Sequence, residues 1–242
     1  MVIKVRSSLY LISWLCVSIM LSGCTAQERT APIHALDGGR SVAGQWRVQH
    51  EDTLYAIAWQ LEADVACLMR VNGIQQASAL RIGQVLRIPS DHDCVQIPSE
   101  PKHAVYHRKS SGIKHTHRGN IEAKGHWQWP LFKPRIVQFF SPKRHQKGLD
   151  IAAKRGQRII APAAGQVVYA GSGIRGYQGP ICLIKHSASL MSAVAGPQAL
   201  SVRVGQWVKQ GQTLGYVSHR ARHARVHIEI RRHGIAMNPL YY

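Results

Sequence analysis

The sequence predicts a mixed fold in two parts: a small α+β module over residues 46–90 and an all-β, mainly antiparallel domain over residues 127–242. Apolar residues recur at helical spacing in the first part, whereas short apolar runs punctuated by Gly and Pro fill the second. Residues 91–126 lie between them and mix Ser, Lys, Arg, Gly and His without an apolar pattern, which is typical of a linker. A chain of 242 residues is long enough for both domains.

Four elements are predicted in the first part. Alternation of polar and apolar residues indicates a strand, and apolar residues three and four apart indicate two helices. Either Asp52 or Thr53 is suited to the N-cap of the first helix. In chain order the expected elements are a strand at 46–49, a helix beginning at Leu54, a helix at about 65–71 that ends at Asn72-Gly73, and a closing strand within 80–89.

This module resembles a LysM domain, and the resemblance implies binding of glycan that contains N-acetylglucosamine, as in peptidoglycan. The binding residues it implies lie in two loops that flank a shallow groove. Glu51 stands where the family usually has glycine. For Leu54 and Ile74 the alternative is a role in the core alone. The motif segments are Trp46-Arg47-Val48, Asp52-Thr53-Leu54, Asn72-Gly73-Ile74 and 83–89, and the implied glycan-binding residues are Asp52, Thr53, Leu54, Asn72 and Ile74.

The N-terminus has the features of an export signal. Lys4 and Arg6 precede an apolar stretch over 9–21, which is too short to span a bilayer. The stretch ends in Leu21-Ser22-Gly23-Cys24, which resembles a bacterial lipobox. The resemblance implies removal of residues 1–23, lipidation of Cys24 and a tether over residues 24–45. An ordinary signal peptide with an incidental cysteine is the alternative.

A lipid on Cys24 predicts attachment to a membrane through the N-terminus. Thr25, rather than Asp, at the sorting position implies the periplasmic side of the outer membrane. The chain carries 31 Lys and Arg against 12 Asp and Glu, a formal net charge of +19, so a polyanionic partner is expected. For an exported protein this partner is anionic lipid or an acidic wall polymer, and nucleic acid is not expected.

Three cysteines remain after the signal segment and Cys24 are set aside. In an oxidising compartment Cys67 and Cys94 can form a disulfide, but three unpaired cysteines, with Cys182 buried in an apolar strand, fit the sequence equally well. Six histidines lie at positions 92, 103, 107, 115, 117 and 126, in and beside the linker. A solvated basic linker is expected there rather than a metal site, because the spacing fixes no ligand geometry.

Closely spaced strands with turns between them predict the antiparallel C-terminal domain. The expected strands are 159–162, 165–170, 181–186, 211–217 and 226–231. The amino-acid sequence of these segments resembles the LytM domain of the M23 metallopeptidase family from about residue 129 to 241. The motifs that carry the resemblance are 147–153, 161–171, 175–177, 184–186, 202–212, 227–231 and 238–240, and segment 187–198 is the least similar to the family.

Active members of the family hold zinc through the His and Asp of an H-x-x-x-D motif and the second His of H-x-H. A further His and the first His of H-x-H assist the bound water. The spacing suits this chemistry, because residues i and i+2 of a strand face the same side and zinc needs three ligands and an open position. Gln146, Asp150, Gly196, Arg225 and His227 stand at these positions here.

Only Asp150 and His227 keep a ligand-type side chain, so the resemblance predicts a degenerate groove without metal, cofactor or catalytic residues. A register shift that brings in His145 is the alternative. The Arg-x-His pattern resembles the NlpD-type murein-hydrolase activators, which carry a LysM domain and a degenerate LytM domain on a lipoprotein. It implies a non-catalytic partner of N-acetylmuramoyl-L-alanine amidases in cell division and cell separation. An active zinc endopeptidase and a purely structural murein-binding lipoprotein are the competing functions.

Residues 127–242 contain 17 Lys and Arg but only two acids, Asp150 and Glu229. Because Asp150 is kept while most of the site is lost, we expect its charge to be used. The guanidinium of Arg225 is expected to pair with it, since the rigid fork of arginine matches a carboxylate. The alternative is that Asp150 only caps a turn.

Overall fold

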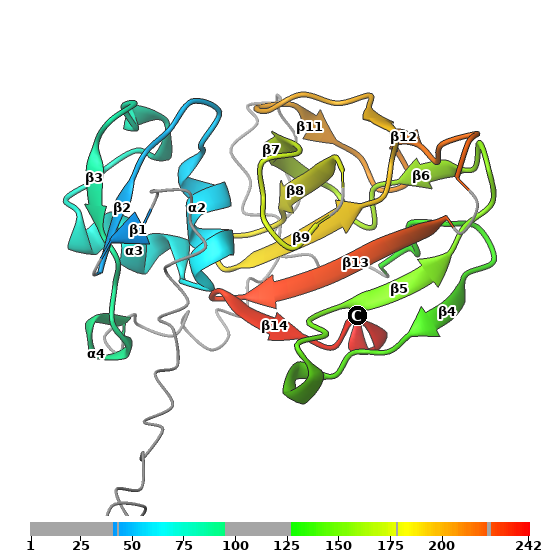
Figure 1. The fold of residues 1–242 in the computed structure, drawn as a ribbon, viewed down its shortest axis with the longest axis horizontal. Helices are drawn as coiled ribbons and strands as arrows, with labels where there is room; N and C mark the ends of the chain where they lie inside the picture. Colours follow the sequence, from blue (N-terminus) through cyan, green and yellow to red (C-terminus); the bar gives the residue numbers. More distant parts are fainter. Residues whose placement is uncertain (1–40, 43, 95–126, 178, 222–223) are drawn as a thin grey trace, which may run out of the picture. The chain divides into compact units, whose positions relative to one another are not determined.

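The computed structural model describes residues 41–42, 44–94, 127–177, 179–221 and 224–242 (Figure 1). The predicted signal peptide, Cys24, most of the tether and most of the linker lie outside these residues. The described residues all belong to one compact unit. In the described part of the chain, no helix is both long and apolar enough to cross a membrane.

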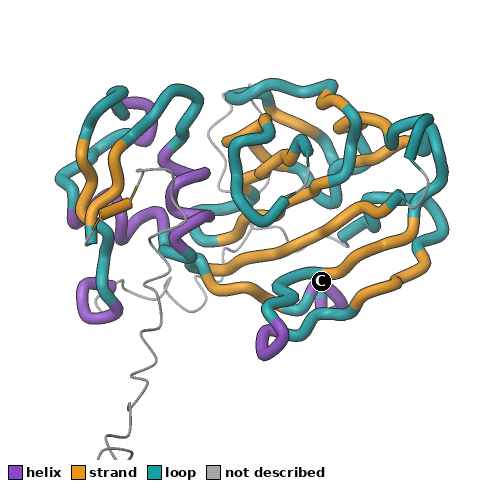
Figure 2. The backbone as a smooth tube through the Cα atoms, in the orientation of Figure 1, coloured by secondary structure: helices purple, strands orange, loops and turns teal. Residues whose placement is uncertain are grey.

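A small α+β region occupies residues 41–94. Three short strands form a sheet in the order β1-β2-β3, and two helices and a 3-10 turn connect β2 to β3 (Figure 2). This agrees with the predicted α+β module. The elements are β1 (Ser41–Val42), β2 (Gln45–Arg47), α2 (Leu54–Leu61), α3 (Val65–Val71), η2 (Ala77–Ala79) and β3 (Val85–Arg87).

Side-chain caps set the starts of both helices. Thr53 is the N-cap of α2 and its hydroxyl oxygen accepts a hydrogen bond from the amide of Ala56 at 3.1 Å. Asp64 caps α3 in the same way and accepts from the amide of Cys67 at 2.9 Å. The helices then bury an apolar core against the sheet, with Trp46, Val48, Leu54, Ile57, Ala58, Leu68 and Leu86 inside.

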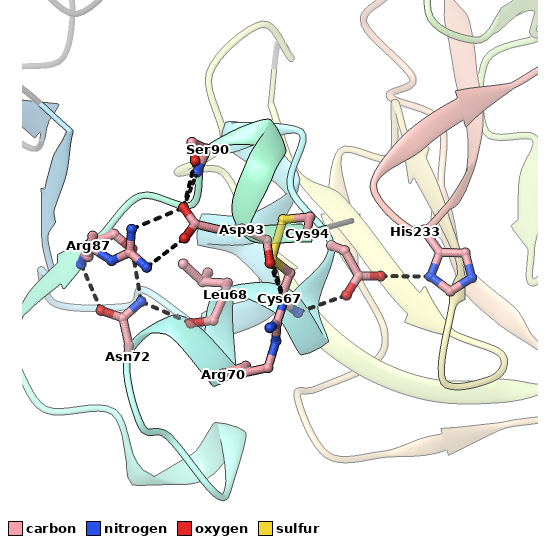
Figure 3. The surroundings of a disulfide bond; sticks show 10 residues. Cys67, Leu68, Arg70, Asn72, Arg87, Ser90, Asp93, Cys94 and His233 are labelled. Carbon is pink, nitrogen blue, oxygen red and sulfur yellow. Dashed lines mark hydrogen bonds and ion pairs between the residues drawn. A yellow bond between two sulfur atoms is a disulfide. The ribbon is translucent and has the colours of Figure 1, made fainter. Parts of the chain in front are cut away.

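Ordered structure continues past residue 90, the predicted end of the module. A helical turn, α4 (Asp91–Cys94), follows β3, and a Cys67–Cys94 disulfide ties it to α3 (Figure 3). Asp93 forms two hydrogen bonds with the Arg87 guanidinium, at 3.0 and 2.9 Å, and these bonds hold the pKa of the Asp93 carboxyl well below its usual range. A covalent bond and an ion pair therefore fix a segment whose composition predicts a loose linker.

The C-terminal region is all-β and mainly antiparallel, which confirms the predicted fold class. Its large sheet runs β11-β7-β8-β9-β13-β5-β4, with β14 paired to β13, and a small sheet runs β10-β12-β6 (Figure 1). Short 3-10 turns lie at Pro142–Arg144 and Pro239–Tyr241. The strands are β4 (Arg135–Gln138), β5 (Leu149–Ala152), β6 (Arg158–Ile160), β7 (Gly165–Gly171), β8 (Ile181–Lys185), β9 (Leu190–Ala195), β10 (Ala199–Leu200), β11 (Trp207–Val208), β12 (Thr213–Tyr216), β13 (Arg225–Arg232) and β14 (Ile235–Met237).

The large sheet is covered on both faces. On one face, side chains such as Ile151, Val194 and Val226 join a core with Ile159 and Leu214 of the small sheet. On the other face, residues of β7, β8 and β9 form a second core that includes Ala56 and Trp59 of α2. Trp59 is only 2% exposed, so helix α2 covers part of this face. We call this second side, which also carries His227, the groove face.

Strand β9 was not among the predicted strands. It lies within segment 187–198, the part least similar to the family, yet it pairs with both β8 and β13 in the middle of the large sheet. All six of its residues are buried. The segment least similar to the family is therefore central to the fold, and its residues Ala195 and Gly196 also line a groove.

Candidate functional site

The implied glycan-binding residues of the first region are largely engaged in the fold. Asp52 accepts hydrogen bonds from the Gln49 amide at 2.9 Å and from the Trp46 indole at 3.3 Å. Thr53 caps α2, and Leu54 is fully buried in the core. These three side chains shape the loop before α2, so a ligand there would meet mainly backbone groups.

Asn72 holds the second loop against the closing strand (Figure 3). Its amide nitrogen donates to the carbonyl oxygens of Leu68 and Arg87, both at 2.9 Å, and its oxygen accepts from the Arg87 amide at 2.7 Å. Ile74 is half-buried and packs against the core. Glu51, where the family usually has glycine, adopts a φ of 66°, the left-handed conformation that glycine favours.

The C-terminal region has a groove of about 740 Å³. All five residues that the family resemblance places at zinc-site positions line it, so the structure brings together residues that lie up to 81 positions apart in the sequence. Trp59, Tyr177 and Glu229 also line it, along with several cations. The five matched residues are Gln146, Asp150, Gly196, Arg225 and His227.

Register explains why these groups meet. Asp150 of β5 is paired directly with His227 of β13, and residues opposite each other in neighbouring strands project to the same face. His227 Nδ1 lies 2.7 Å from Asp150 Oδ1, and Arg225 Nη1 lies 3.6 Å from Asp150 Oδ2. Asp150 thus has the expected ion pair with Arg225, but its closer partner is His227, which the sequence analysis did not pair with it.

A second carboxylate continues the network along β13. Glu229 lies two residues after His227, and its Oε2 is 3.6 Å from His227 Nε2. The Tyr177 hydroxyl donates a hydrogen bond of 2.5 Å to the same Oε2, and the other oxygen, Oε1, accepts one of 2.6 Å from buried Arg231. Arg231 and Tyr177 were not among the residues predicted from the sequence, although the two-residue period of a strand starting from His227 points to positions 229 and 231.

Helix α2 completes the network. The Arg231 guanidinium donates to the Trp59 carbonyl oxygen at 2.6 Å and lies 4.0 Å from the centroid of the indole ring. The Trp59 indole donates to the Tyr177 hydroxyl oxygen at 3.0 Å. Buried Arg231 is therefore satisfied by one carboxylate, one carbonyl and one aromatic face.

The two carboxylates hold His227 in its charged form. Burial lowers the pKa of His227, but hydrogen bonds with Asp150 and Glu229 and the charges of these carboxylates outweigh it and raise the pKa to about 9. The hydrogen bond from His227 lowers the pKa of Asp150. Burial pushes the pKa of Glu229 upward, but His227 and Arg231 bring it below its usual value. The groove thus holds an imidazolium between two carboxylates.

These donors do not fit a catalytic zinc ion. Gln146 has its amide nitrogen 3.4 Å from Asp150 Oδ1, and an amide is a poor substitute for imidazole on zinc. Gly196 has a φ of 123°, and a Cβ there would lie 2.5 Å from the Arg225 carbonyl oxygen, so this position has no room for a histidine. Among the described residues, no three His, Cys, Asp or Glu side chains are grouped as metal ligands.

We expect a small coupling energy between Asp150 and Arg225. The Arg225 side chain is 56% exposed, so its ion pair is screened by water and should contribute only about 0.5 kcal/mol to the free energy of unfolding. A double-mutant cycle of Asp150→Asn and Arg225→Ala, measured by chemical denaturation, gives this energy. A cycle of Asp150→Asn and His227→Gln should give a clearly larger one. Strict additivity in both cycles would contradict the ion pairs described here.

Comparison with known proteins matches both regions to families. The model of peptidase family M23 matches residues 144–239, and the LysM domain model matches residues 47–89. The uncharacterized lipoprotein YgeR of Escherichia coli is 30% identical over 251 residues, which cover 98% of this chain and 93% of the relative. The NlpD/LppB lipoprotein homolog of Pseudomonas aeruginosa is 33% identical over 231 residues, which cover 83% of this chain and 77% of the relative.

A third relative is named for an activity. The murein hydrolase activator NlpD of Escherichia coli is 29% identical over 256 residues, which cover 81% of this chain and 67% of the relative. The two relatives described before it match over most of both chains. The chain therefore belongs to the NlpD/LppB family of lipoproteins with LysM and M23 peptidase domains.

Proposed function

We propose that this protein is a non-catalytic activator of murein hydrolases. The observation that carries the proposal is the groove, where protonated His227 and Arg225 surround Asp150 at positions where the peptidase family places metal ligands and an assisting histidine. Such a groove keeps a binding surface but lacks the donors for activating a water molecule. The name of the Escherichia coli relative, a murein hydrolase activator, supports the same conclusion.

In this proposal each part of the chain has a separate task. Residues 1–23 are removed as a signal peptide, Cys24 carries lipid, and residues 24–45 form a tether on the periplasmic side of the outer membrane. The LysM region over residues 46–90 binds peptidoglycan, with Asp52, Thr53 and Asn72 holding the two loops in shape and Ile74 and backbone groups meeting the glycan. Residues 91–126 form the linker, whose first four residues are the helical turn α4. Residues 127–242 engage the partner.

The partner we propose is an N-acetylmuramoyl-L-alanine amidase that acts during cell separation. A dye-release assay on purified sacculi tests this with three samples: the amidase alone, this protein alone, and both together. We expect release above background only when both are present. The groove predicts that Arg225→Ala weakens activation, while Arg203→Ala, which removes an equal charge from an exposed loop, leaves it nearly unchanged.

Two results would overturn the proposal. Release by this protein alone, together with zinc retained after purification, would indicate an active endopeptidase. No release above that of the amidase in the mixture, with both proteins folded and bound to sacculi, would indicate a purely structural murein-binding lipoprotein.

A further inference from the structure

The groove face of the large sheet is divided into a covered half and an open half. Helix α2 packs on the part of this face formed by β7, β8 and β9, where Ala56 and Trp59 share one core with residues such as Leu183 and Ala193. The start of β13, with Arg225, lies beyond this cover and remains exposed. A ligand of the groove would therefore find free sheet surface next to Arg225, and the side chain of Trp59 would limit it at the other end.

The open half carries two arginines in one row. Strand β5 lies between β4 and β13 (Figure 1). Its Ala152 pairs with Arg135 of β4 on one side and with Arg225 of β13 on the other. The three side chains therefore project to the same face, and the two arginine Cα atoms are roughly 10 Å apart, two strand spacings. Ala152 has no side-chain atom beyond Cβ, so its side chain does not occupy the space between the two guanidinium groups.

Acids match these two cations only in part. Asp150 and Glu229 are the only acids in residues 127–242, and each is engaged with another cation at shorter range: Asp150 with His227 at 2.7 Å, and Glu229 with Arg231 at 2.6 Å. Arg225 reaches Asp150 only at 3.6 Å, and exposed Arg135 has no ion pair among the described residues. The row is thus positively charged, exposed and available to an external anion.

We propose that Arg135 and Arg225, on either side of Ala152, form a carboxylate-binding subsite for an acidic protein segment that enters the groove across the open half of the groove face. Two guanidinium groups can each donate paired hydrogen bonds to one carboxylate, which gives both affinity and orientation. The inference rests on the proposed function, in which a partner protein docks in this groove, and it specifies the chemistry of the docking segment.

A protein segment fits the charges better than the stem peptide of peptidoglycan. The stem peptide carries amino groups as well as carboxylates where it contains a diamino acid, and the surrounding domain, with 17 Lys and Arg, repels an amine. A protein segment with several Asp or Glu residues and no cation gains from the same field along its whole length. Binding should therefore weaken as salt is added.

The first test measures binding of a fluorescent, glutamate-rich model peptide to the full chain by anisotropy. Arg135→Ala and Arg225→Ala should each weaken binding by about tenfold, the expected loss of one charge-assisted hydrogen-bonding group. Arg203→Ala is the matched control, because it removes the same charge from the exposed loop before β11, and it should change affinity by less than about twofold. Equal losses in all three variants would indicate only non-specific attraction and would overturn the subsite.

A second variant supplies the carboxylate from within the chain. Ala152→Glu places an acid between the two arginines, whereas Ala152→Gln has the same size without the charge. We expect Ala152→Glu to reduce peptide binding about tenfold more than Ala152→Gln does and also to unfold at a higher temperature than Ala152→Gln. A merely steric effect would reduce binding equally in both variants, and that result would contradict the proposal.

Two further samples separate the possible outcomes. A disaccharide-tetrapeptide from peptidoglycan that binds more tightly than the model peptide, and depends on the same arginines, would overturn the choice of a protein ligand. Amidase activation measured on the same variants keeps the two proposals distinct. Full activation by the Arg135→Ala and Arg225→Ala variants would refute the subsite and leave the proposed function standing, whereas no activation by the unmodified protein would refute the proposed function.

Discussion

Replacing Glu229 with Gln is expected to lower the free energy of unfolding by about 3–5 kcal/mol, the usual loss when one partner of a buried ion pair is removed. The substitution leaves Arg231 buried beneath Trp59 without a counter-charge, because Glu229 is its only carboxylate partner among the described residues. It also replaces the carboxylate that accepts the hydrogen bond of the Tyr177 hydroxyl with a neutral amide. Chemical denaturation of the full chain, followed by tryptophan fluorescence, measures the effect.

The matched control removes both charges. Arg231→Met keeps an apolar stem under the Trp59 ring, so Glu229→Gln together with Arg231→Met should be more stable than Glu229→Gln alone. The two buried groups are in direct contact, and their effects should therefore not add. A double variant that loses the sum of the two single losses would show that Arg231 and Glu229 act independently, contrary to the geometry.

The protein is expected to lose stability as the pH rises through 9. The folded pKa of His227, about 9, lies above the ordinary value of 6.5, so the folded state binds this proton more tightly than the unfolded state does. The stabilisation is complete below pH 6.5, declines between pH 6.5 and 9, and is absent above that range. A pKa shift of this size corresponds to about 3 kcal/mol in the free energy of unfolding.

Denaturant midpoints measured from pH 6 to pH 10 check this expectation. His227→Gln removes the titrating group, and its stability should vary much less over the same interval. A wild-type profile that is flat between pH 6.5 and 9 would contradict the charged state assigned to His227. Below pH 5 the wild type should lose stability, because the lowered pKa values of Asp150 and Glu229 favour the folded state only while these groups are ionised.

Local chemistry made much of the fold predictable. The start of α2 follows from Thr53, whose hydroxyl can satisfy a free amide at a helix terminus, and the two-residue period of β13 follows from its alternation around His227. Strand β9 could not be predicted in the same way. Its residues Leu190–Ala195 are buried on both faces, so they show no alternation, and only the packing of β8, β13 and α2 around them defines the strand.

The sequence predicted which residues form the candidate site, but it did not predict which of them are in direct contact. Motif spacing identified Asp150, Arg225 and His227, yet it did not predict that His227 would be the closer partner of Asp150. That preference depends on the register between β5 and β13, which is a property of tertiary structure. The role of Trp59 was also not predictable, because a tryptophan on a helix gives no sign of which distant arginine it will cover.

The described part of the chain holds a disulfide and a buried free cysteine, and together they suggest how the protein matures after export. Cys182 lies inside the large sheet, where burial raises the pKa of its thiol to about 12, and a thiol that stays protonated attacks disulfides poorly. Once the C-terminal domain has folded, Cys182 cannot readily exchange with the bond between Cys67 and Cys94. Correct pairing therefore favours a chain in which that domain closes before oxidation is complete, and an unfolded chain exposed to oxidant would scramble its thiols.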